Sequence, residues 1–326
     1  MEYRTLGKTG IQISYLSLGT MTFGSAADEE MSGKIFNRCR EAGINVFDTA
    51  NIYGGNRNGR GEQIVGRLIK SCRDELILST KVGTPRWGGP NDGGLSRRYI
   101  MLEVEKSLKN LQTDRIDIYY IHKLDSRTPM EETLRAMDDL QKQGKILYPA
   151  ISNSAAWQIA LALGISREES IAEFACVQPM YNLVKRQSEV EILELAKAEK
   201  LGVITYSPLG AGLLTGKYTH GDKPEEGRIR TDERYKARYG NPLYFEIAEK
   251  FVDYAAEHGV KPAALAVAWA ASHPAVTSSL IGARNLEQLE DSLAAIEIKM
   301  TPEWRKEIDS LSVEPPPATD RSEEKN

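Results

Sequence analysis

Short, almost continuous apolar runs alternate along this chain with longer segments in which apolar residues recur every three or four positions. Runs such as 44–47, 76–80 and 116–121 are brief and rich in β-branched or aromatic residues, which is typical of buried parallel strands. The segment 31–42 carries its apolar residues at helical spacing before a glycine. The repeated order of strand and then helix predicts an α/β fold with a parallel sheet.

Roughly eight such units fit along the chain, the number that closes into a (β/α)8 barrel of the TIM type. The expected barrel strands lie at 15–20, 44–47, 76–80, 116–121, 146–151, 175–178, 203–206 and 276–281. Before them, residues 3–6 and 11–14 flank a glycine-bounded turn, so an N-terminal β-hairpin cap is expected. We expect one barrel domain over residues 1–312.

Three segments depart from the alternation. Residues 82–95 form a long connection rich in glycine and proline, and such loops are commonly lids or binding loops. Residues 217–241 are polar and charged without periodicity, so we expect an irregular insertion there. Residues 313–326 are rich in proline and charge, which favours a disordered tail.

Composition narrows the class of partner. The chain has 42 basic and 46 acidic residues, a formal charge of -4, and so lacks the basic field that attracts nucleic acid or anionic membranes. Without a long apolar run or a signal-like start, a cytoplasmic location is expected. Cys39, Cys72 and Cys176 are odd in number and far apart, which favours reduced thiols. The four histidines and three cysteines form no pair with ligand spacing, so no metal site is expected.

Three ionisable residues stand where successive expected strands stop, namely Asp48, Lys81 and His122. The carboxyl ends of parallel strands open on one face of a barrel, and the loops at that face carry its chemistry. Asp48, Lys81 and His122 are therefore expected to converge, with Tyr53 reaching them from the loop after Asp48. Singly, each is as readily a loop cap, a packing residue or a structural histidine.

Together these four residues describe proton transfer to an oxygen. A free tyrosine has a pKa of about 10, and a nearby ammonium lowers it by an amount on the order of 1–3 units. Lys81 fits that role for Tyr53, and Asp48 would keep the buried lysine charged. His122 can hydrogen-bond a substrate oxygen. The missing component is a hydride.

The motifs around these residues are specific. Asp48 and Tyr53 lie within Phe-Asp-Thr-Ala-Asn-Ile-Tyr-Gly, Lys81 ends Ser-Thr-Lys, and His122 ends Ile-His. This set resembles the aldo-keto reductases, and the layout of nearly the whole chain looks like the branch with bacterial reductases and potassium-channel β subunits. The resemblance implies a (β/α)8 barrel, NADPH as hydride donor and a carbonyl reduced to an alcohol. It also implies that Tyr53 is the general acid, that Lys81 tunes it, that Asp48 holds Lys81 and that His122 orients the carbonyl.

The sequence does not favour a Rossmann site for the dinucleotide, because the nearest glycine motif, at 210–216, is one residue too long and comes late. In barrels, phosphates commonly lie at the loops after strands seven and eight. The candidates there are Ser207, Pro208, Leu209, Gly210, Gly212, Lys217, Gly282, Arg284 and Gln288. Arg284 can fork onto a 2′-phosphate, which favours NADP over NAD. Gln288 is explained equally well by a capping box with Asn285.

The resemblance implies further contacts with the cofactor. It assigns the nicotinamide amide to Ser152, Asn153 and Gln178, the ring face to Tyr206, and neighbouring positions to Thr20, Met21 and Asp48. Ordinary strand-end caps are the alternative for the first four. Ala150, Ser154 and Ser292 depart from the usual pattern, in which a glycine, a large aromatic residue and an asparagine are more common. These departures bear on how the adenine end of the cofactor binds, and so on the expected preference for NADP.

Substrate identity depends on the loops at the same face. The expected substrate contacts are Phe23, Tyr53, Trp87 and His122, although Trp87 is as readily a packing residue. Polar residues outnumber aromatic ones in these loops, which favours a sugar-like or otherwise hydroxylated carbonyl compound. Two other readings stay open: a cofactor-sensing regulatory subunit, and a barrel in which Lys81 forms a Schiff base, as in aldolases.

Overall fold

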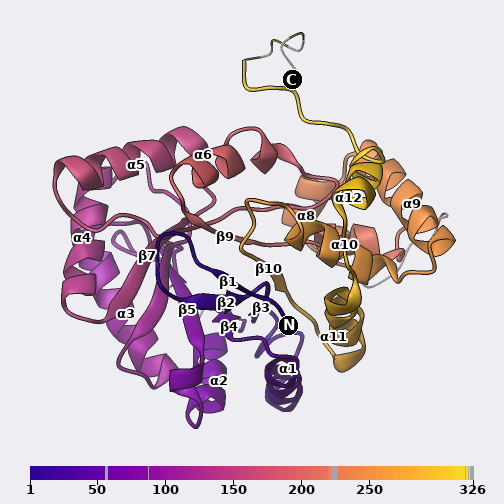
Figure 1. Ribbon diagram of the computed structural model, residues 1–326. Coiled ribbons are helices and arrows are strands. Elements are labelled where there is room, and N and C mark those ends of the chain that lie inside the picture. The colour runs from indigo at the N-terminus through magenta and orange to yellow at the C-terminus, as the bar shows by residue number, and fades with distance from the viewer. Residues whose placement is uncertain are drawn as a thin grey trace.

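Eight parallel strands close into a barrel, which confirms the (β/α)8 prediction (Figure 1). The computed structural model describes residues 1–55, 58–86, 88–219, 221, 227–319, 321 and 323. The barrel strands, in chain order, are β3 (Leu16–Gly19), β4 (Val46–Asp48), β5 (Ile77–Val82), β6 (Ile116–Ile121), β7 (Ile146–Ser152), β8 (Cys176–Gln178), β9 (Gly202–Thr205) and β10 (Ser278–Ile281). Each strand pairs with the next in parallel, and β10 pairs with β3 to close the barrel.

Helices surround the strands as an outer ring. They are α1 (Glu29–Glu41), α2 (Arg60–Ile69), α3 (Arg97–Leu111), α4 (Met130–Lys142), α5 (Ala156–Glu168), α6 (Ile192–Ala198), α9 (Pro242–Glu257), α10 (Pro262–Ala271), α11 (Leu286–Leu293) and α12 (Pro302–Asp309). Short 3-10 turns lie at η1 (Arg73–Glu75), η2 (Gln187–Glu189), η3 (Gly210–Thr215) and η4 (Ala294–Glu297). Helix α5 has no counterpart among the predicted elements. Its outward-facing Trp157 and Leu161 are 66% and 49% exposed, so apolar residues on both faces conceal the helical period.

The insertion at 217–241 is more regular than predicted. It contains two short helices, α7 (Arg228–Thr231) and α8 (Glu233–Tyr239). The side chain of Asp232 accepts a hydrogen bond from the backbone N–H of Arg234 at 2.9 Å and so caps α8. Helices this short carry too few turns to show a period in the sequence.

The predicted hairpin is present and closes the amino-terminal end of the barrel. Strands β1 (Tyr3–Thr5) and β2 (Gln12–Ser14) pair antiparallel. Leu6 and Ile13 of the hairpin are fully buried against side chains of the barrel interior, which include Val46, Ile118, Tyr120, Ala150, Cys176 and Ile204. A Cβ at Gly202 would clash with the side chain of Leu6, so a glycine is needed where the hairpin meets β9. The opposite end of the barrel stays open for the loops.

Three further features bear on the expectations. Among the described residues, no helix is both long and apolar enough to cross a membrane. Residues 313–319 form neither helix nor strand, and the expected tail extends beyond the described part of the chain. The three cysteines are all buried and unpaired.

Candidate active site

The ends of β4, β5 and β6 bring Asp48, Lys81 and His122 together, as their positions in the sequence predict. Asp48 is the last residue of β4, and the strand register places it opposite Ser79, two residues before Lys81 on β5. The Lys81 ammonium donates hydrogen bonds to the Asp48 carboxylate and to the Thr49 carbonyl, the second at 2.8 Å. Lys81 and Asp48 are only 1% and 3% exposed. A buried ion pair of this kind is stable only when its remaining polar atoms are also satisfied.

The second oxygen of Asp48 meets that requirement. It accepts hydrogen bonds from the Ser79 hydroxyl at 2.7 Å and from the Gln178 amide at 3.1 Å. Ser79 belongs to β5 and Gln178 to β8, so the carboxylate is held from two sides of the barrel. The pair is therefore held in place by the protein's own side chains.

Tyr53 and His122 complete the polar tetrad, by which we mean Asp48, Tyr53, Lys81 and His122. The Lys81 nitrogen lies 5.4 Å from the centroid of the Tyr53 ring. The rings of Tyr53 and His122 meet edge to face, with centroids 6.2 Å apart and an angle of 79°. The backbone N–H of His122 donates to the Val82 carbonyl at 2.8 Å, which continues the β5–β6 pairing as far as this residue.

Burial sets the protonation of the tetrad. Burial raises the pKa of Tyr53 well above its ordinary value, and the Asp48 carboxylate raises this pKa further. The net shift of the Tyr53 pKa is thus opposite to the lowering expected from Lys81, whose ammonium hydrogen-bonds to Asp48 and Thr49. Burial also lowers the pKa of Lys81, while Asp48 acts in the opposite direction. Tyr53 is consequently a protonated phenol at neutral pH.

His122 is neutral at the same pH. Burial, followed by the charges of Lys81 and Lys123, lowers its pKa to about 3. A neutral imidazole has one N–H and one free nitrogen, so it can donate a hydrogen bond while carrying no charge. Its Nδ1 lies 3.5 Å from the hydroxyl of Thr84.

Four residues expected at the nicotinamide form one network, the amide cluster of Ser152, Asn153, Gln178 and Tyr206. The Ser152 hydroxyl donates to the Gln178 carbonyl at 2.8 Å, and the Tyr206 hydroxyl donates to the Asn153 amide oxygen at 2.6 Å. The Asn153 amide nitrogen donates to the His122 carbonyl at 2.9 Å, which ties the cluster to the tetrad. Asn153 is exposed and has a φ of 54°, a left-handed value that asparagine tolerates.

Three cations from the segments after β9 and β10 are near enough to influence one another. Burial and the charges of Arg284 and Arg228 lower the pKa of Lys217. No carboxylate of the described residues lies within 4.0 Å of the cationic groups of this cation cluster, Lys217, Arg228 and Arg284. A Cβ at Gly212 would lie 2.5 Å from Lys217 Cε, so the glycine lets the lysine lie against the backbone of η3. The cluster fits an anion such as a phosphate.

Arg228 was not among the predicted residues. It comes from α7 in the insertion, where the sequence showed no period to place it. The other predicted residues of this region, Ser207, Pro208, Leu209 and Gly210, follow β9 directly, and Gly282 follows β10. Ser207 has a φ of 61°, so the loop after β9 turns sharply as it leaves the barrel.

Gln288 takes part in the start of α11. The Asn285 side chain accepts from the Gln288 N–H at 2.9 Å, and the Gln288 side chain accepts from the Arg284 N–H at 3.2 Å. The Asn285 half of the predicted capping box is present, but the Gln288 side chain accepts from Arg284 instead of Asn285, and a cofactor contact of Gln288 stays a prediction. Ser292 is 1% exposed and donates to the Gln288 carbonyl at 3.2 Å, so its hydroxyl is turned into the protein.

Two predicted contacts need correction, and a third cannot be placed. Phe23 was expected to touch substrate, but it is fully buried in the hydrophobic core. Thr20 was expected at the cofactor, but it is also fully buried, and its hydroxyl donates to the Asp48 carbonyl at 2.9 Å. Thr20 thus supports Asp48 instead. Met21 is 37% exposed and lies 3.9 Å from the Tyr235 hydroxyl, while Trp87 lies outside the described residues.

Buried carboxylates behind the tetrad form a group that was not predicted. Glu103 of α3 accepts from the Asn51 amide at 2.8 Å and from the Arg86 guanidinium at 3.0 Å. Glu62 of α2 accepts from the Thr80 hydroxyl at 2.8 Å. Asn51 and Thr80 are close in sequence to Tyr53 and Lys81, so both carboxylates support the tetrad. A charged residue beside the apolar stripe of α3 was the available sequence signal for Glu103.

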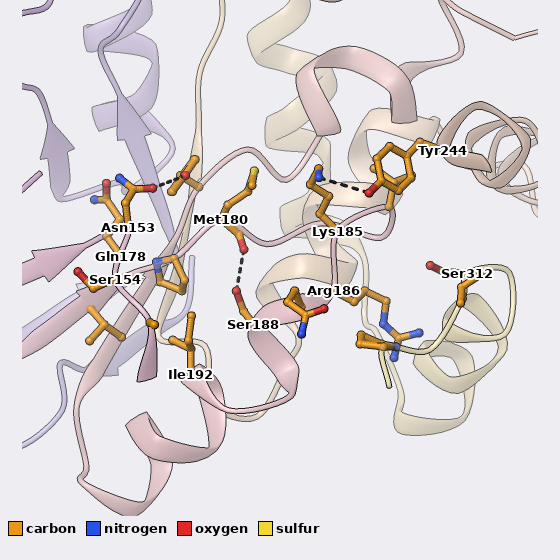
Figure 2. A pocket seen from close by; sticks show the side chains of 18 of the residues that line it. Asn153, Ser154, Gln178, Met180, Lys185, Arg186, Ser188, Ile192, Tyr244 and Ser312 are labelled. Carbon is orange, nitrogen blue, oxygen red and sulfur yellow. Dashed lines mark hydrogen bonds between the residues drawn. The ribbon is translucent and has the colours of Figure 1, made fainter. Parts of the chain in front are cut away.

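A pocket of about 660 Å³ opens beside the amide cluster (Figure 2). Asn153, Gln178 and Tyr206 line one part of it, and the loop between β8 and α6, the start of α9 and the chain at 312–315 line the rest. The pocket borders the tetrad through the amide cluster and does not include tetrad residues. Among the residues that the structure describes, no group of three His, Cys, Asp or Glu side chains is placed to hold a metal ion.

Comparison with known proteins agrees with this arrangement. The Aldo/keto reductase family model matches residues 15–313. The chain is 38% identical over 312 residues to an uncharacterized oxidoreductase, YrpG, of Bacillus subtilis (strain 168), with 93% of each chain covered. It is 36% identical over 332 residues to a probable voltage-gated potassium channel subunit beta of Oryza sativa subsp. japonica, with 98% of this chain and 99% of the relative covered. A protein of the same description from Arabidopsis thaliana is 38% identical over 308 residues, with 91% and 92% covered. The chain belongs to the aldo/keto reductase family.

Proposed function

We propose that this chain is an NADPH-dependent oxidoreductase that reduces an aldehyde or ketone to the alcohol, with Tyr53 as the general acid. The observation that carries the proposal is the polar tetrad at the open end of the barrel, where a protonated phenol and a neutral imidazole lie beside a buried ion pair. Membership of the family and the similarity to an oxidoreductase support the same class of reaction.

The residues beyond the tetrad fit a dinucleotide. The amide cluster offers donors and acceptors to a carboxamide, together with the aromatic face of Tyr206. The cation cluster has no carboxylate partner among the described residues and suits phosphates, including the 2′-phosphate that distinguishes NADPH from NADH. When bound, NADPH supplies the hydride.

Each tetrad residue then has a defined task. His122 donates its single N–H to the carbonyl oxygen and positions it, because the imidazole is neutral. The Tyr53 hydroxyl gives its proton to that oxygen as alkoxide character develops, since an alkoxide is a stronger base than a phenolate. Lys81, whose ammonium lies 5.4 Å from the centre of the Tyr53 ring, is placed to stabilise the negative charge left on the phenol oxygen, and Asp48 holds the lysine there. A proton from solvent restores the phenol for the next turnover.

The substrate class follows from the loops. Polar residues outnumber aromatic ones in the loops expected at the open end, and this favours a sugar-like or otherwise hydroxylated carbonyl compound. Cytoplasmic aldehydes and ketones of that kind are the proposed substrates, and no macromolecular partner is needed for the reaction.

The test is a screen of aldehydes, diketones and keto sugars in which NADPH absorbance is followed with the wild type and with Tyr53→Phe. We expect oxidation of NADPH that depends on at least one carbonyl compound and is lost in the variant. A Tyr53→Phe protein that matched the wild-type rate would refute the role of the phenol.

A second function has one observation in its favour, namely that two relatives are described as probable potassium channel β subunits. In that case the chain would bind NADPH as a cofactor-sensing regulatory subunit. Tight NADPH binding, measured by tryptophan fluorescence, without turnover of any compound in the screen would favour this function over reduction.

A further inference from the structure

The pocket beside the amide cluster contains a cation that the proposed reaction does not use. Lys185 lies in the loop between β8 and α6, and in Figure 2 it lies across the pocket from Asn153 and Gln178. At about 660 Å³ the pocket is of the size that proteins use for small-molecule ligands.

Lys185 is held in place by its backbone. It closes a turn with Asn182, in which the Lys185 N–H donates to the Asn182 carbonyl at 2.9 Å. The Asn182 side chain donates to the Ser207 carbonyl at 2.9 Å, so the turn is attached to the loop after β9. The position of Lys185 is therefore fixed relative to Tyr206 and the amide cluster.

The Lys185 ammonium has neutral partners only. It donates to the Tyr244 hydroxyl at 3.3 Å and lies 4.9 Å from the centroid of that ring and 5.8 Å from the Tyr239 ring. Within the described ranges no carboxylate lies within 4.0 Å of it, although an ammonium has three N–H donors. A cation facing a largely apolar pocket gains most from a counter-charge.

The neighbouring cation provides a contrast. Arg186 also lines the pocket, but it donates to both carboxylate oxygens of Glu189 at 3.0 and 2.8 Å, so its charge is neutralised within the protein. The hydroxyls of Ser188 and Ser312 are likewise engaged, with the Met180 and Leu183 carbonyls. Lys185 is thus the cation of the pocket that remains available to a ligand.

We infer that the pocket binds an anionic group, a carboxylate or a phosphate, on the carbonyl substrate, and that Lys185 recognises it with Tyr244 supporting the ammonium. The inference rests on the proposed function, because it places the reacting carbonyl at the tetrad and the anion in the adjoining pocket. The substrate class narrows to carbonyl compounds with an acidic group remote from the reacting carbon.

The test compares matched aldehydes that differ only in charge, 4-carboxybenzaldehyde and 4-carbamoylbenzaldehyde, with a shorter pair, succinic semialdehyde and butanal. KM is measured at saturating NADPH for the wild type, Lys185→Met and Lys185→Arg. Lys250→Met serves as the control, because Lys250 is an exposed residue of α9 outside the pocket.

We expect Lys185→Met to raise KM for the acids by about 10- to 100-fold, the value of one hydrogen bond to a charged group, and KM for the neutral aldehydes by less than about threefold. Lys185→Arg restores the preference for the acids, and higher salt weakens it. The inference is overturned if Lys185→Met changes KM equally for both members of each pair, or if the wild type prefers neither acid.

A separate measurement distinguishes this failure from failure of the proposed function. If no aldehyde of either kind oxidises NADPH, calorimetry compares binding of 4-carboxybenzyl alcohol and 4-carbamoylbenzyl alcohol to the protein with NADP present. If the wild type binds the acid more tightly and Lys185→Met does not, the anion site is supported although the proposed reduction is refuted. Equal binding of the two alcohols discards the site as well.

Discussion

The two charged regions at the open end of the barrel differ in how their charges are balanced. At the ends of β4 and β5, the ammonium of Lys81 and the carboxylate of Asp48 neutralise each other, and Ser79 and Gln178 bind the remaining oxygen. In the cation cluster after β9 and β10, three positive side chains lie near one another without a carboxylate among the described residues. The first region is complete within the protein, whereas the second gains a balancing charge only from a ligand.

Burial explains the difference. Lys81 and Asp48 are almost completely removed from water, so neither could remain charged without the other. The members of the cation cluster are only partly buried, and water can solvate them until an anion arrives. A region whose charges are neutralised within the protein can hold reacting groups in fixed positions. A region whose positive charges lack a carboxylate partner can bind and release a charged cofactor.

The most severe way to break the first region's function is to remove its proton donor. We expect Tyr53→Phe to reduce kcat on the order of 10²- to 10⁴-fold, the usual contribution of a general acid. The dissociation constant for NADPH, measured by fluorescence titration, should change little, because we propose that the phosphates bind at the other region. Tyr3→Phe, at an exposed tyrosine of the hairpin, is the control. A comparable loss of NADPH affinity in Tyr53→Phe would contradict the separation of the two regions.

Neutralising the second region should weaken cofactor binding. Lys217→Met and Arg284→Met each remove a cation that a phosphate would contact, and we expect the dissociation constant for NADPH to rise by about 10- to 100-fold in each. For Arg284→Met the loss should be smaller with NADH, which lacks the 2′-phosphate. Equal losses with both nucleotides would show that Arg284 does not read that phosphate.

The third prediction concerns the buried carboxylates behind the tetrad and tests whether they belong to the first region. Asn51→Ala removes the amide that donates to buried Glu103, and we expect the free energy of unfolding to fall by about 1–2 kcal/mol. Urea denaturation measures the loss, and kcat should fall too, because Asn51 is two residues from Tyr53. Asn91→Ala, at an exposed position in the loop before α3, is the control, because its side chain has no hydrogen bond among the described residues. If the free energy of unfolding of Asn51→Ala equals that of the wild type, the first region consists only of the tetrad and its direct partners.

The smallest effect concerns His122 and pH. Its folded pKa of about 3 is below the unfolded value of about 6.5, so the unfolded chain binds the proton more readily. The free energy of unfolding should therefore fall as pH decreases from 6.5 toward 3, and His122 contributes its full stability above 6.5. Solvent at the open end reduces the slope to below about 1 kcal/mol per pH unit.

Denaturation of the wild type and His122→Asn between pH 7 and 5 measures this slope. We expect the variant to lose less stability than the wild type over that range. Parallel curves for the two proteins would mean that His122 titrates normally in the folded state.

The sequence predicted the site residues that lie at strand ends. It did not predict those residues whose orientation depends on tertiary packing. Asp48, Lys81 and His122 were recognisable because each ends a strand, and the barrel then brings such residues together. Phe23 and Thr20 sit near a strand end as well, but packing turns them into the core, which no local pattern reveals.

Electrostatic properties were also beyond the sequence. The pairing of Lys81 with Asp48 was expected, but the bond from Lys81 to the Thr49 carbonyl and the upward shift of the Tyr53 pKa by burial were not. Arg228 and Lys185 belong to segments without periodicity or a motif, and their relevance appears only when the loops are placed around the barrel.

The hairpin that covers the amino-terminal end has a practical consequence for handling the protein. Leu6 and Ile13 close that end, so a tether or purification tag joined to Met1 would emerge on the side away from the reacting groups. A fusion beyond Pro315 would instead begin at the rim of the pocket that Lys185 lines. Immobilised preparations of this barrel should therefore be anchored at Met1 and not directly after Pro315.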